Sequence, residues 1–359
     1  PLSPENVSVN DGGLVVVFEG DSKSDPIEVT ITTDESMSQN VTYAFPLQVT
    51  STTKGVHSGT DHIVFVKNCK GKKFASSAKP SGIKLFSCME TGSTNPLFHK
   101  SFMLEKSGLP LFDVVILFSA KIVYDEEECR LKIWNTPAIS GIIQSDVVQQ
   151  LHDYGMKVVI SVLGSDEAGV AHLTDAACRT FAQEIANYCE AYDLDGVFFD
   201  DEYTYSWNHP GLTSPSTDRA ARLCFETKMA MPDKLVTCYI YSRTYGFYKK
   251  IEGMEPGDFV DYAISDYGSW DYEDCYLGME RNQVAPCSAN FASSYARWTA
   301  TQNNLQRVRN EGFGGFMVYC LTFHVADVWN REMESLRNIA KYLYDDNLVF
   351  TGEKPETTW

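Results

Sequence analysis

The sequence predicts an α/β protein of two parts, a (β/α)8 TIM barrel over residues 109–346 and, before it, a small all-β sandwich domain over residues 1–95. Two observations support this division. Short apolar runs separated by turn residues fill the first part and leave no room for a helix of ten residues. After residue 109, buried-strand runs alternate with helix-like segments, giving eight strand candidates in about 240 residues, as a (β/α)8 barrel requires.

The first part carries five strand candidates. They are Leu14–Phe18, Ile27–Ile31, Tyr43–Val49, Ile63–Val66 and Ile83–Cys88. Pro46 has no backbone N–H to donate, so the third run is predicted to lie at an edge or a bulge. A stretch with Gly, Ser, Thr, Asn and Pro at 89–96 closes this part, and residues 96–108 are predicted to form a linker.

The second part alternates strands and helices. The strand candidates are Phe112–Ser119, Lys157–Gly164, Asp195–Asp200, Leu235–Tyr241, Val260–Ile264 and Gly315–Leu321, with weaker ones at Arg130–Trp134 and Gln283–Ser288. The helix candidates are Ser145–Tyr154, Asp175–Tyr192 with Thr174 as N-cap, Asp218–Met231, Ser294–Asn310 and Val328–Tyr344. A doubly wound sheet is the alternative, but no glycine-rich loop follows the first strand. Residues 347–359 are predicted to be a C-terminal tail.

Charge and composition exclude several classes of function. The chain has 30 Lys and Arg against 48 Asp and Glu, a net charge of −18, which argues against nucleic-acid and anionic membrane partners. No apolar run reaches the roughly 20 residues of a membrane-spanning helix. The chain begins at Pro1 without an initiator Met, so we expect a mature fragment whose signal peptide has been removed, located outside the cytoplasm in the periplasm, at the cell surface or secreted.

The cysteines and histidines give no metal signature. None of the ten cysteines forms a CxxC pair, and no histidine lies at zinc-ligand spacing from a cysteine pair. We therefore expect free, buried thiols, with no metal and no cofactor.

The strongest chemical signal is the stretch from Leu194 to Tyr203 at the end of a predicted barrel strand. Side chains alternate along a strand, so Phe198, Asp200 and Glu202 are predicted to point into the barrel mouth, where active sites of such barrels lie. Two carboxylates close together in a partly buried pocket suit acid/base chemistry on a glycosidic oxygen, because one is pushed toward protonation. An acidic turn or a divalent-cation site explains the residues equally well.

Six segments in order resemble glycoside hydrolase family 18, and more closely its endo-β-N-acetylglucosaminidases of the endoglycosidase H type. They are Phe112–Val115 with Ala120–Asp125, Lys157–Gly164, Leu194–Tyr203, Met231–Lys234, Asp261–Ala263 with Tyr267–Trp270, and Glu311–Gly314. The first part lies outside this resemblance. Around Tyr43–Thr50 it is similar to β-modules that precede such barrels in exported bacterial glycan-degrading proteins.

The resemblance implies a role for each matching residue. Glu202 matches the general acid/base, and Asp200 the carboxylate that orients the substrate's 2-acetamido group. Tyr267 matches a tyrosine that holds the acetamido carbonyl. The nucleophile is then the substrate's own carbonyl oxygen, with an oxazolinium intermediate and retention of configuration. Asp195 and Gly196 match structural positions at the strand start, and Ser161 and Gly164 a small-residue stretch beneath the sugar.

Aromatic residues at or after strand ends suit sugar binding, with core or rim packing as the equal alternative. The candidates for substrate binding are Tyr124, Tyr203, Trp207, Tyr241, Trp270 and Tyr319. Trp298, inside a predicted helix, is expected to pack in the core. His209 and His324 fall in predicted rim loops, where a solvated residue is the more common case.

The implied function is hydrolysis of the β-1,4 bond of the N,N′-diacetylchitobiose core of N-glycans, by a monomer acting on N-linked glycans or glycoproteins. A chitinase-like hydrolase of β-1,4-GlcNAc polymers and a non-catalytic glycan-binding protein are the alternatives. Phe198 stands where the family usually has Asp, which affects the expected pH profile, and Asp266 precedes Tyr267 where relatives carry a bulkier or amide-bearing stretch. Glu202 favours an active enzyme.

Overall fold

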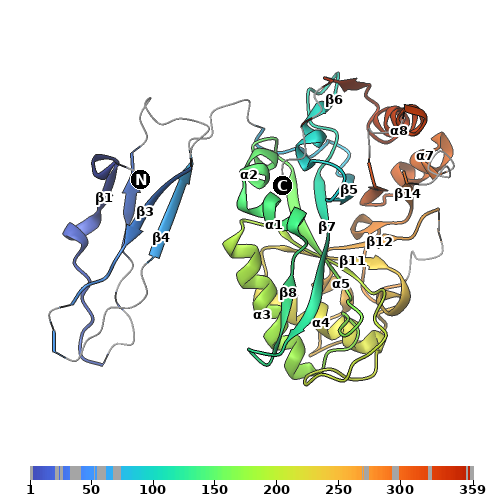
Figure 1. Ribbon diagram of the computed structural model, residues 1–359. Coiled ribbons are helices and arrows are strands. Elements are labelled where there is room, and N and C mark those ends of the chain that lie inside the picture. Colours follow the sequence, from blue (N-terminus) through green and yellow to red (C-terminus); the bar gives the residue numbers. More distant parts are fainter. Residues whose placement is uncertain are drawn as a thin grey trace. The chain divides into compact units, whose positions relative to one another are not determined.

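A computed structural model (Figure 1) describes residues 3–20, 24, 27–32, 42–51, 53–54, 62–67, 74–268, 270, 275–292, 299–321, 326–352 and 355. The chain divides into two units, Pro1–Lys72 and Lys73–Trp359. The division lies earlier than the predicted one at residue 95. The reason is that the run Ile83–Cys88, assigned to the first part, belongs to a strand of the larger unit.

The described residues of the smaller unit form two antiparallel ribbons. Strand β1 (Val7–Val9) pairs with β2 (Val29–Ile31), β3 (Thr42–Leu47) pairs with β4 (His62–Lys67), and two 3-10 turns, η1 (Pro4–Asn6) and η2 (Asn10–Gly13), flank β1. Phe45 is the centre of its small core. Pro46 lies within β3, and a two-stranded ribbon tolerates it because each strand is an edge. The predicted strand Leu14–Phe18 is wrong, since these residues are exposed and irregular.

The larger unit confirms the predicted barrel. Its parallel strands follow the order β13-β12-β11-β10-β9-β7-β5-β15-β14, and only two residues separate β13 from β14, so one stretch of chain closes the circle. The strands are β5 (Lys84–Glu90), β7 (Val114–Asp125), β9 (Lys157–Leu163), β10 (Gly196–Asp200), β11 (Leu235–Ile240), β12 (Tyr262–Ser265), β13 (Val284–Ala285), β14 (Ser288–Asn290) and β15 (Gly315–Tyr319).

The strand β8 (Arg130–Trp134) is not a barrel strand, so that prediction is wrong. It pairs antiparallel with the far end of β7 and forms a hairpin beyond the barrel. Its place in the barrel is taken by β5, which pairs with β7 and β15. The predicted linker and tail also differ. The predicted linker contains the 3-10 helix η3 (Pro96–Ser101) and the strand β6 (Phe102–Leu104). Strand β6 pairs with β16 (Leu348–Phe350), which lies in the predicted tail.

Helices cover the outside of the barrel (Figure 1). In the described residues they are α1 (Pro137–Gln144), α2 (Val147–His152), α3 (Asp175–Ala191), α4 (Thr217–Ala230), α5 (Pro256–Phe259), α7 (Gln302–Asn310) and α8 (Ala326–Asn338), with the short 3-10 helices η4 (Ser242–Thr244) and η5 (Arg281–Gln283) and the π-helix η6 (Ile339–Leu343). Thr174 caps α3 as predicted, because its hydroxyl accepts the Ala177 N–H. Trp298 and His324 lie outside the described residues.

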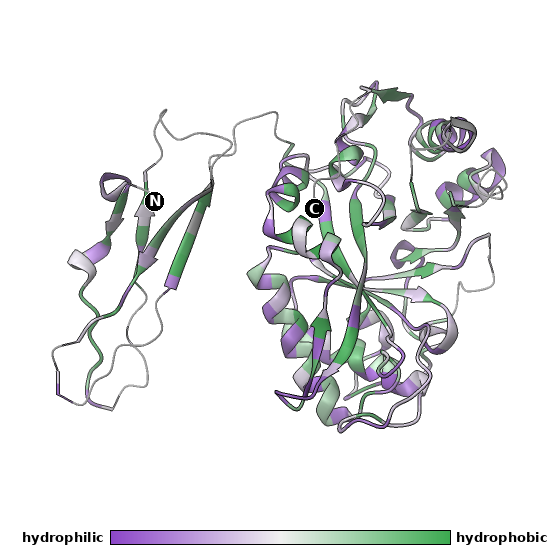
Figure 2. Ribbon diagram, in the orientation of Figure 1, coloured by the Kyte–Doolittle hydropathy of each residue, from purple (hydrophilic) through white to green (hydrophobic). Residues whose placement is uncertain are grey.

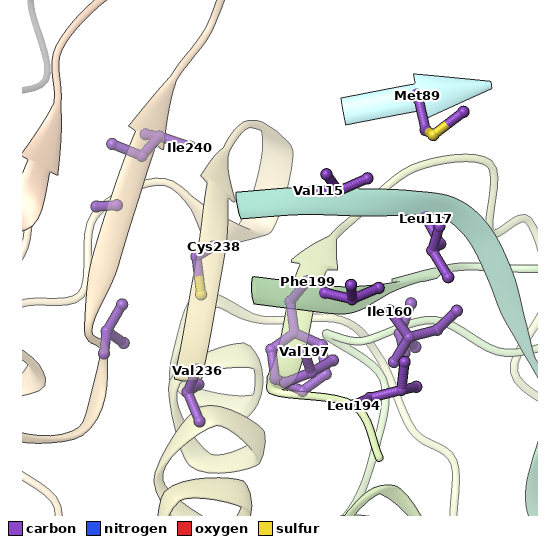
Figure 3. Close-up of a cluster of buried hydrophobic side chains, with 14 of the residues drawn as sticks. Met89, Val115, Leu117, Ile160, Leu194, Val197, Phe199, Val236, Cys238 and Ile240 are labelled. Carbon is purple, nitrogen blue, oxygen red and sulfur yellow. The ribbon is translucent and has the colours of Figure 1, made fainter. Parts of the chain in front are cut away.

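The barrel strands are rich in hydrophobic residues (Figure 2). Because side chains alternate along a strand, these residues form two apolar layers. The outward layer packs against the helices and includes Val197, Phe199 and Cys238 (Figure 3). The inward layer fills the barrel and includes Phe198 and Tyr239. The predicted division of this strand is therefore confirmed, with Val197 and Phe199 outside and Phe198 inside.

Three aspartates connect neighbouring strands at the amino-terminal end of the barrel strands. Each immediately precedes a strand, and its carboxylate accepts a backbone N–H from the strand before it. Asp113 accepts from Leu85 (2.8 Å), Asp195 from Val158 (2.7 Å), and Asp261 from Val236 (2.7 Å). Each also contacts a basic side chain, Lys79, His152 and Lys228 respectively. The aspartates therefore help to set the relative register of β5 and β7, β9 and β10, and β11 and β12.

The ion pair of Asp113 differs from that of Asp261 in burial. The side chains of Lys79 and Asp113 are 1% and 2% exposed, whereas those of Lys228 and Asp261 are 15% and 28% exposed. Removing one partner of a buried pair leaves an uncompensated charge, so Asp113→Ala should lower the free energy of unfolding by about 3–5 kcal/mol. Asp261→Ala should cost about 1 kcal/mol, the value of an ordinary hydrogen bond.

Urea unfolding followed by tryptophan fluorescence measures both variants, because every tryptophan lies after residue 72 and so reports on the larger unit. Equal losses for the two variants would contradict this account of the Asp113 pair.

Candidate functional site

A cavity of about 480 Å³ lies at the carboxyl ends of the barrel strands. Its lining comes from the inner faces of these strands and the loops after them, and consists of Cys88, Glu90, Phe118, Phe198, Asp200, Glu202, Tyr203, Tyr239, Tyr241, Asp266, Tyr267, Asn290, Met317 and Tyr319. Acidic and tyrosine side chains dominate this set, and no lysine or arginine belongs to it. The cavity therefore suits an uncharged ligand with hydroxyl and amide groups.

Two carboxyl groups meet at the floor of this cavity. Asp200 is the last residue of β10 and only 3% exposed, while Glu202, two residues further, is half-buried. Their side chains are hydrogen-bonded to each other, and Oδ1 of Asp200 has no partner in the described structure. The two carboxyl groups hold one proton between them, because a single buried pocket does not stabilise two adjacent charges.

Burial and neighbouring charges raise the pKa of both groups. Burial, then the charges of Glu202 and Asp201, hold the pKa of Asp200 well above its usual range. Burial also raises the pKa of Glu202, although hydrogen bonds from Tyr203 and Asp200 partly offset that rise. The pattern is that of a protonated Asp200 donating to the Glu202 carboxylate. The free protein thus keeps a transferable proton next to a carboxylate that faces the cavity.

Phe198 and Asp201 shape the surroundings of this pair. Phe198 lies one inward position before Asp200 on the same strand, is 1% exposed, and contributes an apolar floor. Asp201 points away from the barrel interior, is 5% exposed, and accepts the backbone N–H of Arg243 at 3.1 Å. Its charge acts on both carboxyl groups from outside the cavity.

A wall of tyrosines faces the carboxyl pair. The hydroxyl of Tyr239 donates to Asp266 at 2.5 Å and is hydrogen-bonded to Tyr267, whose own backbone N–H donates to Asp266 at 2.6 Å. The Tyr319 hydroxyl donates to Glu90. Burial raises the pKa of Tyr239, Tyr267 and Tyr319, so these hydroxyls keep their protons. The only hydroxyl protons of Tyr239 and Tyr319 are thus already donated to Asp266 and Glu90, and Tyr267 is the tyrosine of the three whose hydroxyl can turn from its neighbour to a bound ligand.

The structure brings one group of the sequence-predicted site residues together. Asp200, Glu202, Tyr203, Tyr241, Tyr267 and Tyr319 all line the cavity. Tyr203 holds a left-handed backbone conformation (φ 61°), which turns the chain away from the strand directly after Glu202.

Other predicted residues lie next to the cavity or away from it. Ser161 is fully buried on β9 beside Phe198, and Gly164 packs so closely on the Glu202 backbone that a Cβ has no room. Tyr124 stacks on His209 at 4.7 Å, and Trp207 packs against His172. Trp270 packs against Arg307 and Phe313.

Sequence reasoning missed seven residues of the lining, namely Cys88, Glu90, Phe118, Tyr239, Asp266, Asn290 and Met317. Cys88 and Glu90 were missed because their strand was assigned to the first domain. Tyr239 carried a usable signal, since it lies two residues before Tyr241 and shares its inward face. Among the described residues, no helix is long and apolar enough to cross a membrane. No group of three His, Cys, Asp or Glu side chains within the described ranges suits a metal ion.

Comparisons with known proteins agree on one kind of relative. The chain is 38% identical over 322 residues to endo-β-N-acetylglucosaminidase F1 of Elizabethkingia meningoseptica, covering 88% of this chain and 94% of the relative. It is 27% identical over 220 residues to an endo-β-N-acetylglucosaminidase of Flavobacterium sp. (strain SK1022), covering 60% and 68%. No protein-family model matches the chain.

Solved structures give the same picture. The crystal structure of Bacteroides thetaiotaomicron EndoBT-3987 with Man5GlcNAc product has a TM-score of 0.72 and 30% identity, and covers 99% of this chain and 83% of the other. The complex of EndoBT-3987 with Man9GlcNAc2Asn substrate has the same TM-score at 29% identity, covering 92% and 81%. A chitinase of the same organism (TM-score 0.51, 12% identity, covering 73% and 96%) shares the fold.

The charge of Asp201 gives a testable prediction for the carboxyl pair. Because that charge raises the pKa of Asp200 and of Glu202, Asp201→Asn should lower both apparent pKa values of the pair while retaining the oxygen that accepts the Arg243 N–H. Titration followed by ¹³C NMR of labelled carboxyl groups measures the shift.

Asp233→Asn is the control, since Asp233 is exposed in the turn between α4 and β11, at the opposite end of the barrel. An unchanged titration in Asp201→Asn would show that Asp201 does not act on the pair.

Proposed function

The chain belongs to the endo-β-N-acetylglucosaminidases of glycoside hydrolase family 18, and on that premise we propose that it hydrolyses the β-1,4 bond between the two N-acetylglucosamine residues of the N-glycan core. The observation that carries the proposal is the hydrogen-bonded pair of Asp200 and Glu202 at the cavity floor. Because the substrate would be a glycoprotein or its glycan, we also propose a location outside the cytoplasm. The chitinase-like alternative has only the shared fold in its favour.

Glu202 acts as the general acid and then as the general base. It lines the cavity, where it can reach a glycosidic oxygen, and burial raises its pKa. As general acid it gives its proton to the oxygen of the leaving N-acetylglucosamine while the bond from C1 to that oxygen breaks. As general base it then takes a proton from the attacking water, which restores its protonated state.

Asp200 handles the 2-acetamido group of the substrate. Asp200 lines the cavity, and its buried Oδ1, which has no partner in the described structure, is an acceptor for the acetamido N–H. When that N–H arrives, the shared proton moves to Glu202 and leaves Asp200 as a carboxylate. The acetamido carbonyl oxygen attacks C1, and the negative charge of Asp200 stabilises the resulting oxazolinium ion. Water then opens this ion, with overall retention.

The tyrosine wall orients the reacting group. The hydroxyl of Tyr267 remains protonated and lies in the cavity, so it can donate to the acetamido carbonyl oxygen. Tyr203 and Tyr241 are 56% and 43% exposed at the rim, where their rings can pack on the apolar faces of sugars. Correct placement of the carbonyl next to C1 converts the attack into an intramolecular step, which is where much of the rate enhancement arises.

Replacing Glu202 tests the proposed acid. Glu202→Gln keeps the shape of the side chain but removes the transferable proton, so kcat should fall by about 10²–10⁴-fold while glycan binding persists. Mass spectrometry of a high-mannose glycoprotein after incubation measures the released glycan, and chitin oligomers serve as the comparison substrate. Unchanged turnover would remove Glu202 from the mechanism, and cleavage of chitin oligomers alone would favour the chitinase-like alternative.

The identity of the nucleophile is tested with two inhibitors. If the acetamido oxygen attacks, a thiazoline mimic of the bicyclic intermediate should inhibit competitively, because it resembles the species that Asp200 and Tyr267 stabilise. A fluorosugar that traps enzyme carboxylates should leave no covalent adduct in the mass spectrum of the intact protein. An adduct on Asp200 would overturn the substrate-assisted mechanism.

A further inference from the structure

A second pocket of about 330 Å³ adjoins the catalytic cavity. The two share Glu202, Tyr203 and Tyr241 in their linings, so a ligand can occupy both at once. The second pocket adds residues from the loops after β9, β10 and β11, namely His172, Asp201, Thr204, Pro215, Ser242 and Arg243. Of the ionisable side chains it adds, His172 and Arg243 have no part in the proposed reaction, and Asp201 acts on it only through its charge.

His172, which lines this pocket, is buried and has a ring nitrogen without a hydrogen-bond partner in the described structure. Its side chain is 3% exposed and packs against the Trp207 ring at 5.3 Å, while its Nδ1 side faces Gly169. Its Nε2 has no hydrogen-bond partner among the described residues. Burial, together with the charge of Arg243, lowers the pKa of this imidazole, so it is neutral and retains one donor and one acceptor. A buried polar atom without a partner costs free energy, which a ligand hydroxyl would recover.

Arg243 and Asp201 supply complementary groups to the same pocket. The backbone N–H of Arg243 donates to Oδ2 of Asp201, which holds the exposed arginine against the buried carboxylate. The Arg243 guanidinium makes no hydrogen bond or ion pair with any side chain in the described ranges. Its N–H groups are therefore available to donate to a ligand. The pocket therefore contains free donors, a carboxylate acceptor and a neutral imidazole.

The pocket is built on two loops that are tied to each other. The Thr213 N–H donates to the His172 carbonyl at 2.8 Å, and the Ser216 N–H donates to the Ala171 carbonyl at 3.1 Å. Thr204 donates to the Ala168 carbonyl at 3.3 Å and packs so closely on Gly169 that a Cβ at that position has no room. These contacts fix the wall before a ligand arrives, and so reduce the entropy lost on binding.

We propose that this second pocket is a subsite for a neutral sugar unit of the glycan substrate, an inference that rests on the proposed function. Vicinal hydroxyl groups match the guanidinium of Arg243, the carboxylate of Asp201 and Nε2 of His172, while Tyr203 and Tyr241 offer ring faces. The carboxyl groups of Asp201 and Glu202 disfavour an anionic sugar. The sugar is either the N-acetylglucosamine on the leaving-group side of the cleaved bond or a mannose from a branch of the glycan.

Arg243→Ala tests the subsite with three substrates. The first is a branched Man9GlcNAc2Asn glycan, and the second is the linear trisaccharide Manβ1,4GlcNAcβ1,4GlcNAc. The third is the aryl glycoside made from this trisaccharide by replacing its reducing-end sugar with 4-methylumbelliferone. Loss of a charged hydrogen bond predicts a fall in kcat/KM of about 10–100-fold on each substrate that reaches the pocket. A branch sugar in the pocket predicts the loss on the first substrate alone. A leaving-group sugar predicts it on the first two.

No loss on any substrate, or an equal loss on all three, would overturn the subsite, because an equal loss reports on catalysis instead. His172→Phe removes Nε2 and keeps an aromatic ring, and should show the same substrate pattern as Arg243→Ala. Arg179→Ala is the matched control, since Arg179 is an exposed arginine on α3 whose guanidinium pairs with Glu226. Arg243 is exposed, so its variant should fold even if His172→Phe does not.

Calorimetry separates this inference from the proposed function. Man9GlcNAc2Asn titrated into Glu202→Gln and into the double variant Glu202→Gln with Arg243→Ala measures binding without turnover. About tenfold or more weaker binding by the double variant supports the subsite, and equal binding overturns it. Absence of hydrolysis by the unmodified protein on all three substrates would instead contradict the proposed function.

Discussion

The hydrogen bond between the side chains of Asp200 and Glu202 is the interaction on which the rest of the site depends. A carboxyl group that is 3% exposed cannot hold a charge next to a second carboxylate without a large loss of free energy, so the pair shares one proton. That proton is available for transfer, and the remaining charge is available for stabilising a cation. The proposed reaction needs a proton donor and a negative charge, and the proton shared by the two carboxyl groups supplies both.

The barrel supplies the conditions for this constraint. Parallel strands bring their carboxyl ends to one mouth, and the three aspartates at the opposite end help to hold the strands in register there. Phe198 then fills the inward position before Asp200, where the family usually has an aspartate. With a phenyl ring below it, Asp200 has no deeper carboxyl group on its own strand with which to share a proton. Its partner is therefore Glu202, at the cavity surface.

The loops after β10 and β11 serve two purposes in this arrangement. Asp201 raises the pKa of the catalytic pair from one side and lines the proposed sugar subsite on the other. Its hydrogen bond from the Arg243 N–H joins the two loops, so that electrostatics and substrate binding are linked through a single carboxylate. A substrate that contacts Arg243 and Asp201 would therefore also act on the environment of Glu202.

The sequence by itself determined what depends on local periodicity. Alternation along β10 placed Phe198 and Asp200 inward and Val197 and Phe199 outward, and the residue types of this strand pointed to acid/base chemistry. The cap of α3 by Thr174 was also readable, because a cap involves only residues three positions apart. These features need no knowledge of distant contacts.

Tertiary structure alone decided which apolar runs pair with one another. The runs Ile83–Cys88 and Arg130–Trp134 were both strand candidates, yet the first belongs to a barrel strand and the second forms a hairpin, because pairing depends on partners far away in the sequence. The same reason explains why Glu90 and Asp266 were not predicted as cavity residues. Which side chains share a cavity is set by strand order and closure, and no local pattern encodes these.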